Sequence, residues 1–428
     1  MKLGFYFNSK HLKEWSWEDF ENGQLPLSGT DNLNLYLPLA LARVGLDISF
    51  FSTGLGGQVE RLKQFQVQNL SEAAELAKAQ QLDLLWFSNT GLDETEDGVK
   101  TCDRLGQPCI VSDGNGPSEY FADLVKDSPE VRRVVCWSAT QADLLRDHKV
   151  FKKTEFVYHP LLQRLDGSPI TRDPRAICYL GSLTESKGFH HLAKAWPLIH
   201  AAVPDAKLMV LGSGRLYQRG MELGPLGVAA DDFERRKLIP HLGGTRAAAA
   251  GLGVRFLGLA SPRVVQQTLA QSAVCVVNPN CTTNFETFCV SAIEASEAGT
   301  AVVGANRGGL RETIVHKKTG IRINSETDLA PTLIHLLKYP DLTVTLGAEG
   351  RRWVRQAFAA EKILTQWQSL FERVLNDQPA NPPNFSWGRA DTKIVLKEMI
   401  RQSNRLLGAN RLPTLHRMKA RIQPNIIG

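Results

Sequence analysis

The sequence predicts an α/β protein of two domains, each with a parallel sheet covered by helices. The length of 428 residues exceeds one ordinary core and fits two domains of about 150–200 residues. Short apolar runs alternate with stretches of helical periodicity along the chain. Most of these runs are almost continuously apolar, which is typical of strands buried on both faces of a parallel sheet.

The apolar runs predict the strands in order along the chain. They lie at residues 3–7, 48–51, 82–87, 109–111, 134–137, 176–180, 208–211, 254–257, 274–277 and 301–303. Because helical stretches separate many of them, we expect βαβ units.

A polar, proline-containing break at residues 163–175 separates two similar α/β series. We therefore place one domain at 1–165 and the other at 170–365. Residues 366–428 are predicted to hold a last helix and a tail. The three prolines at positions 379, 382 and 383 exclude a regular helix between this last helix and the tail.

The composition, 43% apolar and 22% charged, is that of an ordinary globular protein. No apolar stretch approaches the roughly 18–20 residues that span a bilayer, and the first ten residues are predicted to form a strand rather than a signal peptide. The seven cysteines are scattered, and no pair has zinc-site or redox-motif spacing. A reducing cytoplasm is therefore the expected compartment.

The net charge of +6 is concentrated in the tail, because residues 388–428 carry nine Lys or Arg against Asp391 and Glu398. The rest is close to neutral, so the charge does not indicate nucleic-acid binding. Two interpretations of the tail stay open. It is either a basic amphipathic segment on an anionic membrane surface or a solvated helix.

The stretch from Asn278 to Gly309 predicts a binding site for a diphosphate. A strand runs into a loop with Thr282, Thr283, Asn284 and Phe285, and a helix is predicted to start near 286–288 and to end before Gly299. Ligands of open α/β sheets bind where strand ends meet helix starts, and a helix start offers unpaired N–H groups and about half a positive charge. The expected contacts come from Thr287, Phe288, Cys289 and Val290.

Glu286 and Glu294 are eight residues apart, which on one helix is roughly 12 Å along the axis. A carboxylate accepts hydrogen bonds from two hydroxyls, so it suits the diols of ribose and hexose. The alternative is that Glu286 only favours the helix dipole and that Glu294 is a solvated helix residue.

Two glycine-containing turns follow other predicted strands. In the first, Gly181, Ser182 and Lys187 precede a helical stretch, and Lys187 offers a cation to a phosphate whose charge grows as it departs. In the second, Gly212 and Gly214 follow the strand at 208–211. The alternatives are a solvated lysine before a helix and a purely structural turn.

These residues resemble glycosyltransferase family 4, the retaining group 1 transferases with the GT-B fold, strongly over 170–320 and weakly over 1–165. The resemblance implies two Rossmann-like domains facing across a cleft, with a C-terminal helix at 361–375 returning to the first. It implies that Glu286 contacts the donor sugar, Glu294 the nucleotide ribose and Lys187 the diphosphate.

The sequence departs from the family pattern at two places in this half. Ser182 stands where the family usually has Arg, and Arg215 or Arg307 are candidate replacements for that cation. Cys289 stands where Gly is usual, which narrows the space near the phosphate.

The resemblance is looser in the N-terminal half. The turn before the first predicted helix places Gly29 and Thr30 where their N–H groups reach a phosphate or the acceptor, with Asp31 as an N-cap. The family often has His after the strand at 109–111. Here Asp113 and Asn115 are the polar candidates, and an Asn is no general base near pH 7. The alternative is a glycine-rich turn with an Asp cap.

The predicted activity is a retaining, metal-independent transfer of a hexose from a nucleotide-sugar to a hydroxyl of a glycan or lipid-linked saccharide, with Glu286 and Lys187 in catalytic roles. The nucleotide-sugar is a co-substrate, so no cofactor is expected. The sequence has no Asp-x-Asp and no His/Cys cluster for a metal. The alternatives are a silent nucleotide-sugar-binding protein and a GT-B-fold epimerase or phosphorylase. The enzyme is expected in the cytoplasm, with peripheral contact on the inner membrane face through the tail as one alternative.

Overall fold

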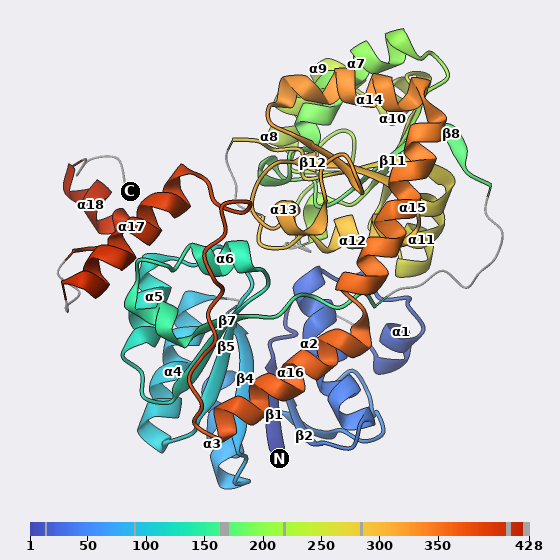
Figure 1. Ribbon diagram of the computed structural model, residues 1–428. Helices are drawn as coiled ribbons and strands as arrows, with labels where there is room; N and C mark the ends of the chain where they lie inside the picture. Colours follow the sequence, from blue (N-terminus) through green and yellow to red (C-terminus); the bar gives the residue numbers. More distant parts are fainter. Residues whose placement is uncertain are drawn as a thin grey trace. The chain divides into compact units, whose positions relative to one another are not determined.

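The computed structural model describes residues 1–12, 15–89, 91–162, 171–216, 220–282, 286–407 and 412–422. The chain divides into two compact units, whose elements are labelled in Figure 1. The first comprises Met1–Lys10, Leu33–Tyr158 and Glu361–Gly428, and the second comprises His11–Asn32 and His159–Ala360.

The first unit contains a seven-stranded parallel sheet in the order β3-β2-β1-β4-β5-β6-β7. Its strands are β1 (Lys2–Phe7), β2 (Asp47–Ser52), β3 (Lys63–Gln66), β4 (Leu84–Asn89), β5 (Cys109–Asp113), β6 (Val131–Cys136) and β7 (Thr154–Phe156). The crossover helices include α3 (Leu70–Ala79), α4 (Leu92–Leu105), α5 (Glu119–Lys126) and α6 (Ala139–Asp143). Helix α2 (Gly29–Arg43) begins in the second unit and continues in the first.

The second unit contains a six-stranded parallel sheet in the order β10-β9-β8-β11-β12-β13. Its strands are β8 (Asp173–Leu180), β9 (Lys207–Leu211), β10 (Val254–Gly258), β11 (Ser272–Val277), β12 (Ala301–Ala305) and β13 (Gly320–Ile323). Its helices include α1 (Trp17–Glu21), α7 (Phe189–Ala202), α8 (Asp231–Phe233), α9 (Ile239–Leu242), α10 (Arg246–Gly251), α11 (Pro262–Gln271), α12 (Val290–Glu297), α13 (Leu310–Thr313), α14 (Leu329–Lys338) and α15 (Pro340–Ala357).

The predicted α/β class with two Rossmann-like sheets is confirmed. Every residue of β4, β5, β11 and β12 is buried, as strands covered on both faces require. In the second unit, α7 covers one face with buried residues at helical spacing, and α12 contributes to a separate core cluster with β11 and β12. The order of each sheet reverses next to its first strand, and ligands of such sheets bind at this point.

The boundaries of the units differ from the predicted 1–165 and 170–365. Residues 11–32 lie with the second unit, where Gly29 packs closely on Val290 at the start of α12. The second unit resumes at His159, and most of the predicted break, residues 163–170, lies outside the described residues. Contacts between residues so distant in sequence leave no mark in a local pattern.

Helix α16 (Ala360–Leu375) returns to the first unit, as the resemblance implied for residues 361–375. Trp367 packs against Trp86 with ring centroids 6.0 Å apart, and Phe371 packs against Phe5 at 6.1 Å. Both Trp367 and Phe371 are fully buried. The predicted last helix is therefore part of the core of the first sheet.

The tail packs on the first unit through α17 (Thr392–Leu406) and α18 (Leu415–Ile422). Lys397 Nζ lies 2.5 Å from Asp147 Oδ1, and Arg146 Nη1 donates to Glu398 Oε2 over 2.9 Å. Residues 378–391 form no helix, as the prolines predict. Among the helices within the described ranges, none has the length and apolarity to cross a membrane.

Candidate active site

Two loops meet at the carboxyl ends of β8 and β11, where the order of the second sheet reverses. The loop after β8 carries Lys187 in the 3-10 turn η2 (Glu185–Lys187), and the loop after β11 leads to Glu286. Asn280 Nδ2 ties the loops by donating to the carbonyl of Glu185 over 3.1 Å. Lys187 Nζ lies 2.8 Å from Glu286 Oε2. The two residues predicted to be catalytic are thus in contact.

A pair of glycines fixes the backbone around Glu286. Gly309 N–H donates to the carbonyl of Glu286 over 2.7 Å. A Cβ atom at Gly308 would lie 2.2 Å from that carbonyl oxygen, and one at Gly309 would lie 2.5 Å from Phe288 Cα. Real Cβ atoms do not approach so closely, so only glycine fits at either position. Half-buried Thr287 lies in the same turn.

The Glu286 carboxylate is held in its ionised form. Burial by itself raises the pKa of Glu286, but the charge and hydrogen bond of Lys187, together with two further hydrogen bonds, outweigh it. Asn278 Nδ2, at 2.8 Å, and the Phe288 N–H donate to the same carboxylate. The net effect lowers the pKa of Glu286, so this side chain is an anion at neutral pH and suits hydroxyl groups as an acceptor.

Helix α12 begins at Val290, later than the predicted start near 286–288. Cys289 is its N-cap and has φ of 75°, a left-handed conformation that favours glycine. Glu286 therefore precedes the helix, and the predicted 12 Å separation from Glu294 along one helix does not apply. The glycine pair at 308–309 packs against residues 286–288 and holds this segment outside the helix.

The start of α12 still offers donors to an anion. The Phe288 N–H, predicted as a donor to a diphosphate, serves Glu286 instead. The N–H groups of Cys289 and Val290 have no hydrogen-bond partner among the residues that the structure describes. Burial and the charge of Glu286 raise the pKa of the Cys289 thiol, which therefore stays neutral. Two amides thus remain beside the Lys187–Glu286 pair.

Glu294 lies in the body of α12 and is half-buried. Its carboxylate has no hydrogen-bond or ion-pair partner within the described part of the chain. Burial raises the pKa of Glu294 to about 7. A buried carboxylate without a partner can accept hydrogen bonds from the hydroxyl groups of a ligand.

We expect Glu294→Gln to stabilise the ligand-free chain at pH 8 by about 1–2 kcal/mol and to change little at pH 5. The folded chain holds this proton more tightly than the unfolded chain does, so stability falls as pH rises from about 4.5 to 7 and the cost is full above 7. Denaturant unfolding at both pH values measures this. Exposed Glu222→Gln serves as the control, and an equal gain at both pH values would contradict the assignment.

The remaining predicted residues of this half support the loops. Ser182 is buried and donates through Oγ to the carbonyl of Ser213 over 3.3 Å, so it has a structural role. A Cβ atom at Gly212 would lie 1.9 Å from the carbonyl oxygen of Gly181, and Gly214 N–H donates to the carbonyl of Val228 over 2.8 Å. These glycines therefore allow the turns after β8 and β9 to lie against each other.

Both arginines considered as replacements at the Ser182 position bind backbone carbonyls. Arg215 Nε donates to Met221 O over 2.8 Å, and Arg307 Nη1 donates to Cys281 O over 2.7 Å. Arg307 directly precedes the glycine pair that holds Glu286, and it reaches the loop after β11. Arg307 is therefore the better placed of the two.

The turn at Gly29 lies against α12 within the second unit. A Cβ atom at Gly29 would lie 2.7 Å from Val290 Cγ2. Ser28, not Asp31, caps α2, because Ser28 Oγ accepts from the Asp31 N–H over 3.2 Å. Asp31 instead contacts His11 Nε2 at 3.2 Å. Thr30 lies in the first turn of α2 between these residues.

Asp113 and Asn115 lie in the first unit, at the carboxyl end of β5. Asp113 is buried, and burial raises its pKa to about 7 in spite of hydrogen bonds from the Asn115 N–H and Asn89 Nδ2. Its Oδ2 has no partner among the described residues. Gln141 Nε2 donates hydrogen bonds to the backbone carbonyls of both Asp113 and Asn115.

Sequence reasoning missed two residues near Glu286. Asn278 has a positive φ of 34° and holds the Glu286 carboxylate; its place directly after a strand was the available signal. His159 is buried and stacks on Phe288 at 5.4 Å, and burial lowers its pKa to about 3. No local motif marks His159, because its neighbours come from a distant segment.

One group of metal-ligand type occurs within the described ranges, formed by Glu119, Asp123 and His148 in the first unit. Two cations already compensate its charge. Lys126 Nζ lies 2.6 Å from Asp123 Oδ1, and Arg417 of the tail contacts Glu119 at 3.1 Å and Asp123 at 2.5 Å. The group therefore anchors the tail.

Comparisons with known proteins find similarity to glycosyl transferases. Residues 165–353 match the family model for glycosyl transferases group 1. The chain is 23% identical over 339 residues to a GDP-mannose-dependent monoacylated alpha-(1-6)-phosphatidylinositol monomannoside mannosyltransferase of Corynebacterium glutamicum, covering 72% of this chain and 79% of that protein. It is 28% identical over 206 residues to the D-inositol 3-phosphate glycosyltransferase of Corynebacterium aurimucosum, covering 46% and 44%.

Two solved structures are similar over most of the chain. The sucrose-phosphate synthase of Thermosynechococcus elongatus superposes with a TM-score of 0.66 at 18% identity, covering 88% of this chain and all of that one. Anabaena HepE, solved with UDP and glucose, gives 0.63 at 14% identity, covering 87% and 99%. The chain is therefore a glycosyltransferase with the GT-B fold, similar to those of family 4.

Proposed function

We propose that the enzyme transfers a hexose from a nucleotide-sugar to a hydroxyl acceptor with retention of configuration and without a metal. The contact between Lys187 and Glu286, beside the free amides at the start of α12, supports this proposal most directly. It combines a cation and two N–H groups for a diphosphate with an ionised carboxylate for a sugar.

Each group has one role in this scheme. Lys187 Nζ and the N–H groups of Cys289 and Val290 bind the diphosphate, and Glu286 accepts hydrogen bonds from the hexose. Glu294 accepts the ribose hydroxyls. The bond between the anomeric carbon and the diphosphate oxygen breaks as the acceptor oxygen bonds to that carbon on the same face. The acceptor proton passes to the departing diphosphate oxygen, so no nucleophile of the enzyme is required.

In this scheme, groups of the protein compensate the charge of the diphosphate in place of a metal. Negative charge grows on the diphosphate as it departs, and Lys187 with the positive end of α12 stabilises it. Arg307, in the neighbouring loop, adds a further cation to this end of the sheet. Preorganised groups of this kind act without the solvent reorganisation that water would need.

The acceptor is proposed to be a glycan or a lipid-linked saccharide. The relative from Corynebacterium glutamicum is named for such a lipid-linked mannoside. All seven cysteines are free thiols, which supports a reducing cytoplasm as the compartment.

A transfer assay tests this function. A panel of UDP-, GDP- and ADP-sugars is first screened for protection against thermal unfolding. The protecting donor is then incubated with acceptors in excess EDTA, with detection of nucleoside diphosphate and NMR of the anomeric proton. We expect acceptor-dependent release and a retained configuration. An inverted product or loss of activity in EDTA would contradict the mechanism, and protection without release would indicate a silent binding protein.

The tail is proposed to contact an anionic membrane. Three apolar residues of α17, Leu396, Met399 and Leu406, are 41%, 60% and 89% exposed, whereas Ile394 and Ile400 of the same helix are buried. An exposed apolar stripe beside basic residues is typical of helices that lie on a membrane surface.

We expect Met399→Gln/Leu406→Gln to lower co-sedimentation with phosphatidylglycerol vesicles severalfold, because the apolar face that enters the headgroup region is lost. The matched control is Leu198→Gln, which removes a leucine that is 64% exposed on α7. Equal binding of both variants would refute membrane contact through α17.

A further inference from the structure

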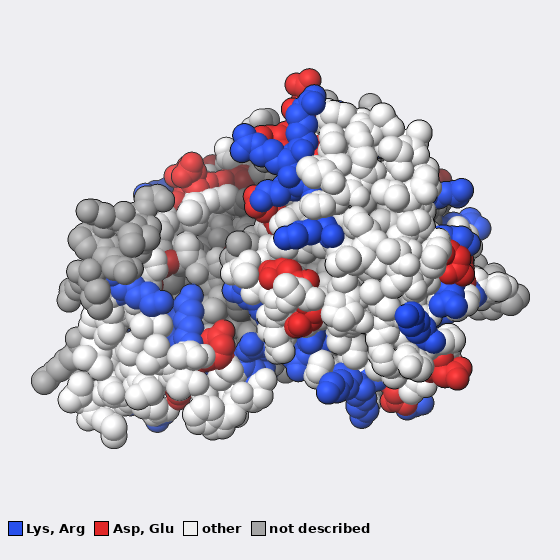
Figure 2. All heavy atoms as spheres, turned by 90° about the horizontal axis from the view of Figure 1, so that it is seen from above, with Lys and Arg blue, Asp and Glu red and all other residues white. Residues whose placement is uncertain are grey.

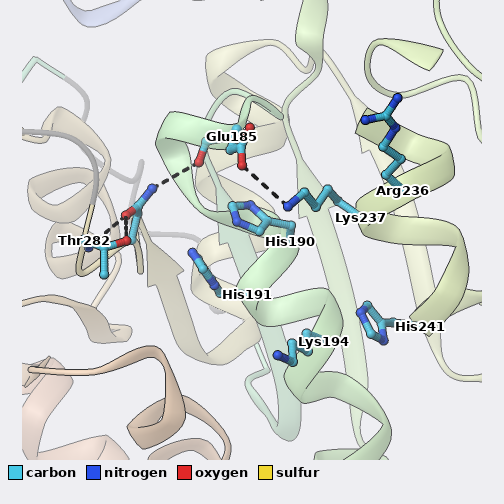
Figure 3. A pocket seen from close by; sticks show the side chains of 9 residues that line it. Glu185, His190, His191, Lys194, Arg236, Lys237, His241 and Thr282 are labelled. Atoms are coloured by element: carbon cyan, nitrogen blue, oxygen red, sulfur yellow. Dashed lines mark hydrogen bonds and ion pairs between the residues drawn. The ribbon is translucent and has the colours of Figure 1, made fainter. Parts of the chain in front are cut away.

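The second unit contains a pocket of about 440 Å³ outside the Lys187–Glu286 site. It lies between the start of α7, the π-helical turn η4 (Glu234–Leu238), helix α9 and the loop after β11. Figure 3 shows the side chains around it. They are Glu185, His190, His191, Lys194, Arg236, Lys237, His241, Asn280 and Thr282.

Most of the side chains that line this pocket are hydrogen-bond donors, either positively charged or neutral. Lys194 has no ion pair or hydrogen bond to the described part of the chain. Lys237 has a single distant partner, Glu185, at 3.7 Å. Arg236 points away from the others in Figure 3 and pairs with Asp232 at 2.6 Å. The uncompensated charge of the pocket therefore comes from Lys194 and, in part, from Lys237.

The histidines add unused hydrogen-bonding capacity. His190 Nδ1 is buried and has no partner among the described residues. Burial lowers the pKa of His190 to about 4, so the ring is neutral at neutral pH. A buried polar atom without a partner costs free energy that a ligand can recover. His241 likewise has no hydrogen-bond or ion-pair partner among the described residues, and its side chain lines the same pocket (Figure 3).

The pocket lining contains more cationic side chains than carboxylates. On the face drawn in Figure 2, Lys and Arg side chains are interspersed with acidic ones. In the pocket, by contrast, Glu185 is the single carboxylate among nine lining residues, and its side chain is 64% exposed. The pocket therefore favours an anion.

We propose that this pocket binds a small phosphorylated molecule. A phosphate group accepts from a lysine, an imidazole N–H and an amide at once. The volume exceeds what one phosphate ion needs and lies within the range of small-molecule sites, about 300–1,000 Å³. This site is additional to the proposed donor site.

The pocket is lined in part by the loops after β8 and β11, which also carry Lys187 and Glu286. Glu185, on its wall, belongs to the same 3-10 turn as Lys187. Asn280 lines the pocket and donates to the carbonyl of Glu185. A molecule bound there contacts the turn that positions Lys187, so its binding is coupled to the geometry of the donor site.

Titration calorimetry on the full chain tests the proposal, with glucose 6-phosphate and inorganic phosphate as probes and glucose as the uncharged control at matched ionic strength. We expect glucose 6-phosphate to bind more tightly than inorganic phosphate and glucose not to bind. Lys194→Gln/Lys237→Gln is expected to weaken binding at least about tenfold. Both lysines are exposed, so the variant keeps its fold.

Two controls separate this pocket from other sites. Lys338→Gln removes an exposed lysine at the end of α14 and should leave binding unchanged. Lys187→Gln, which disables the proposed donor site, should also retain binding of both phosphate probes. Loss of binding in Lys187→Gln alone, or equal affinities in the double variant and Lys338→Gln, would overturn the proposal. Equal affinity for both phosphate probes would overturn the assignment to a molecule larger than phosphate.

Discussion

Glu286→Gln is expected to lower kcat for sugar transfer about a thousandfold while the affinity for the nucleoside diphosphate changes only severalfold. The carboxylate is ionised and accepts from Lys187, Asn278 and the Phe288 N–H. An amide of the same size removes the charge and turns one acceptor into a donor that faces other donors. The loss should therefore appear in the chemical step more than in binding.

Steady-state kinetics and calorimetry on the same protein separate these two effects. Glu222→Gln is the matched control, because Glu222 is exposed in the same unit and lies outside the site. A folded Glu286→Gln enzyme with the turnover of the parent would exclude Glu286 from catalysis.

Lys187→Gln is expected to lower kcat/KM by about a hundred- to a thousandfold and to weaken binding of the nucleoside diphosphate at least about tenfold. The ammonium group is the cation that contacts Glu286, and in the proposed mechanism it stabilises the departing diphosphate. Its charge also holds down the pKa of Glu286. Without it, burial dominates and the pKa of Glu286 rises.

The pH profile gives this variant a second readout. The acidic limb of the pH dependence of kcat should move to higher pH, since Glu286 must be ionised to accept hydrogen bonds from the sugar hydroxyls. Lys187→Arg should restore part of the rate and return the limb toward its original position. An unshifted limb in Lys187→Gln would show that the two side chains do not act together.

Much of the fold was predictable from the sequence because buried parallel strands leave continuous apolar runs. The runs at 274–277 and 301–303 lie within fully buried strands in the structure. The start of α12 was not predictable, because nothing in a cysteine indicates the left-handed φ of Cys289. The segment just before it, residues 286–288, packs against the glycine pair at 308–309, about twenty residues downstream, and a local pattern does not reveal that contact.

The candidate site shows the same division. Lys187 and Glu286 were identifiable from local turns, and the structure brings them into contact. The hydrogen bond from Asn278 and the grouping of residues 11–32 with the second unit depend on contacts made only after folding. Ser182 has a buried structural role, which a comparison of side-chain types does not reveal.

The return of α16 has a consequence for biosynthesis on the ribosome. The second unit has all of its residues once synthesis has reached Ala360, whereas the first lacks Trp367 and Phe371, which fill its core against Trp86 and Phe5. The unit that contains most of the residues translated first is therefore the last to be completed, and a nascent chain that ends between Ala360 and Trp367 lacks the aromatic side chains that cover Trp86 and Phe5.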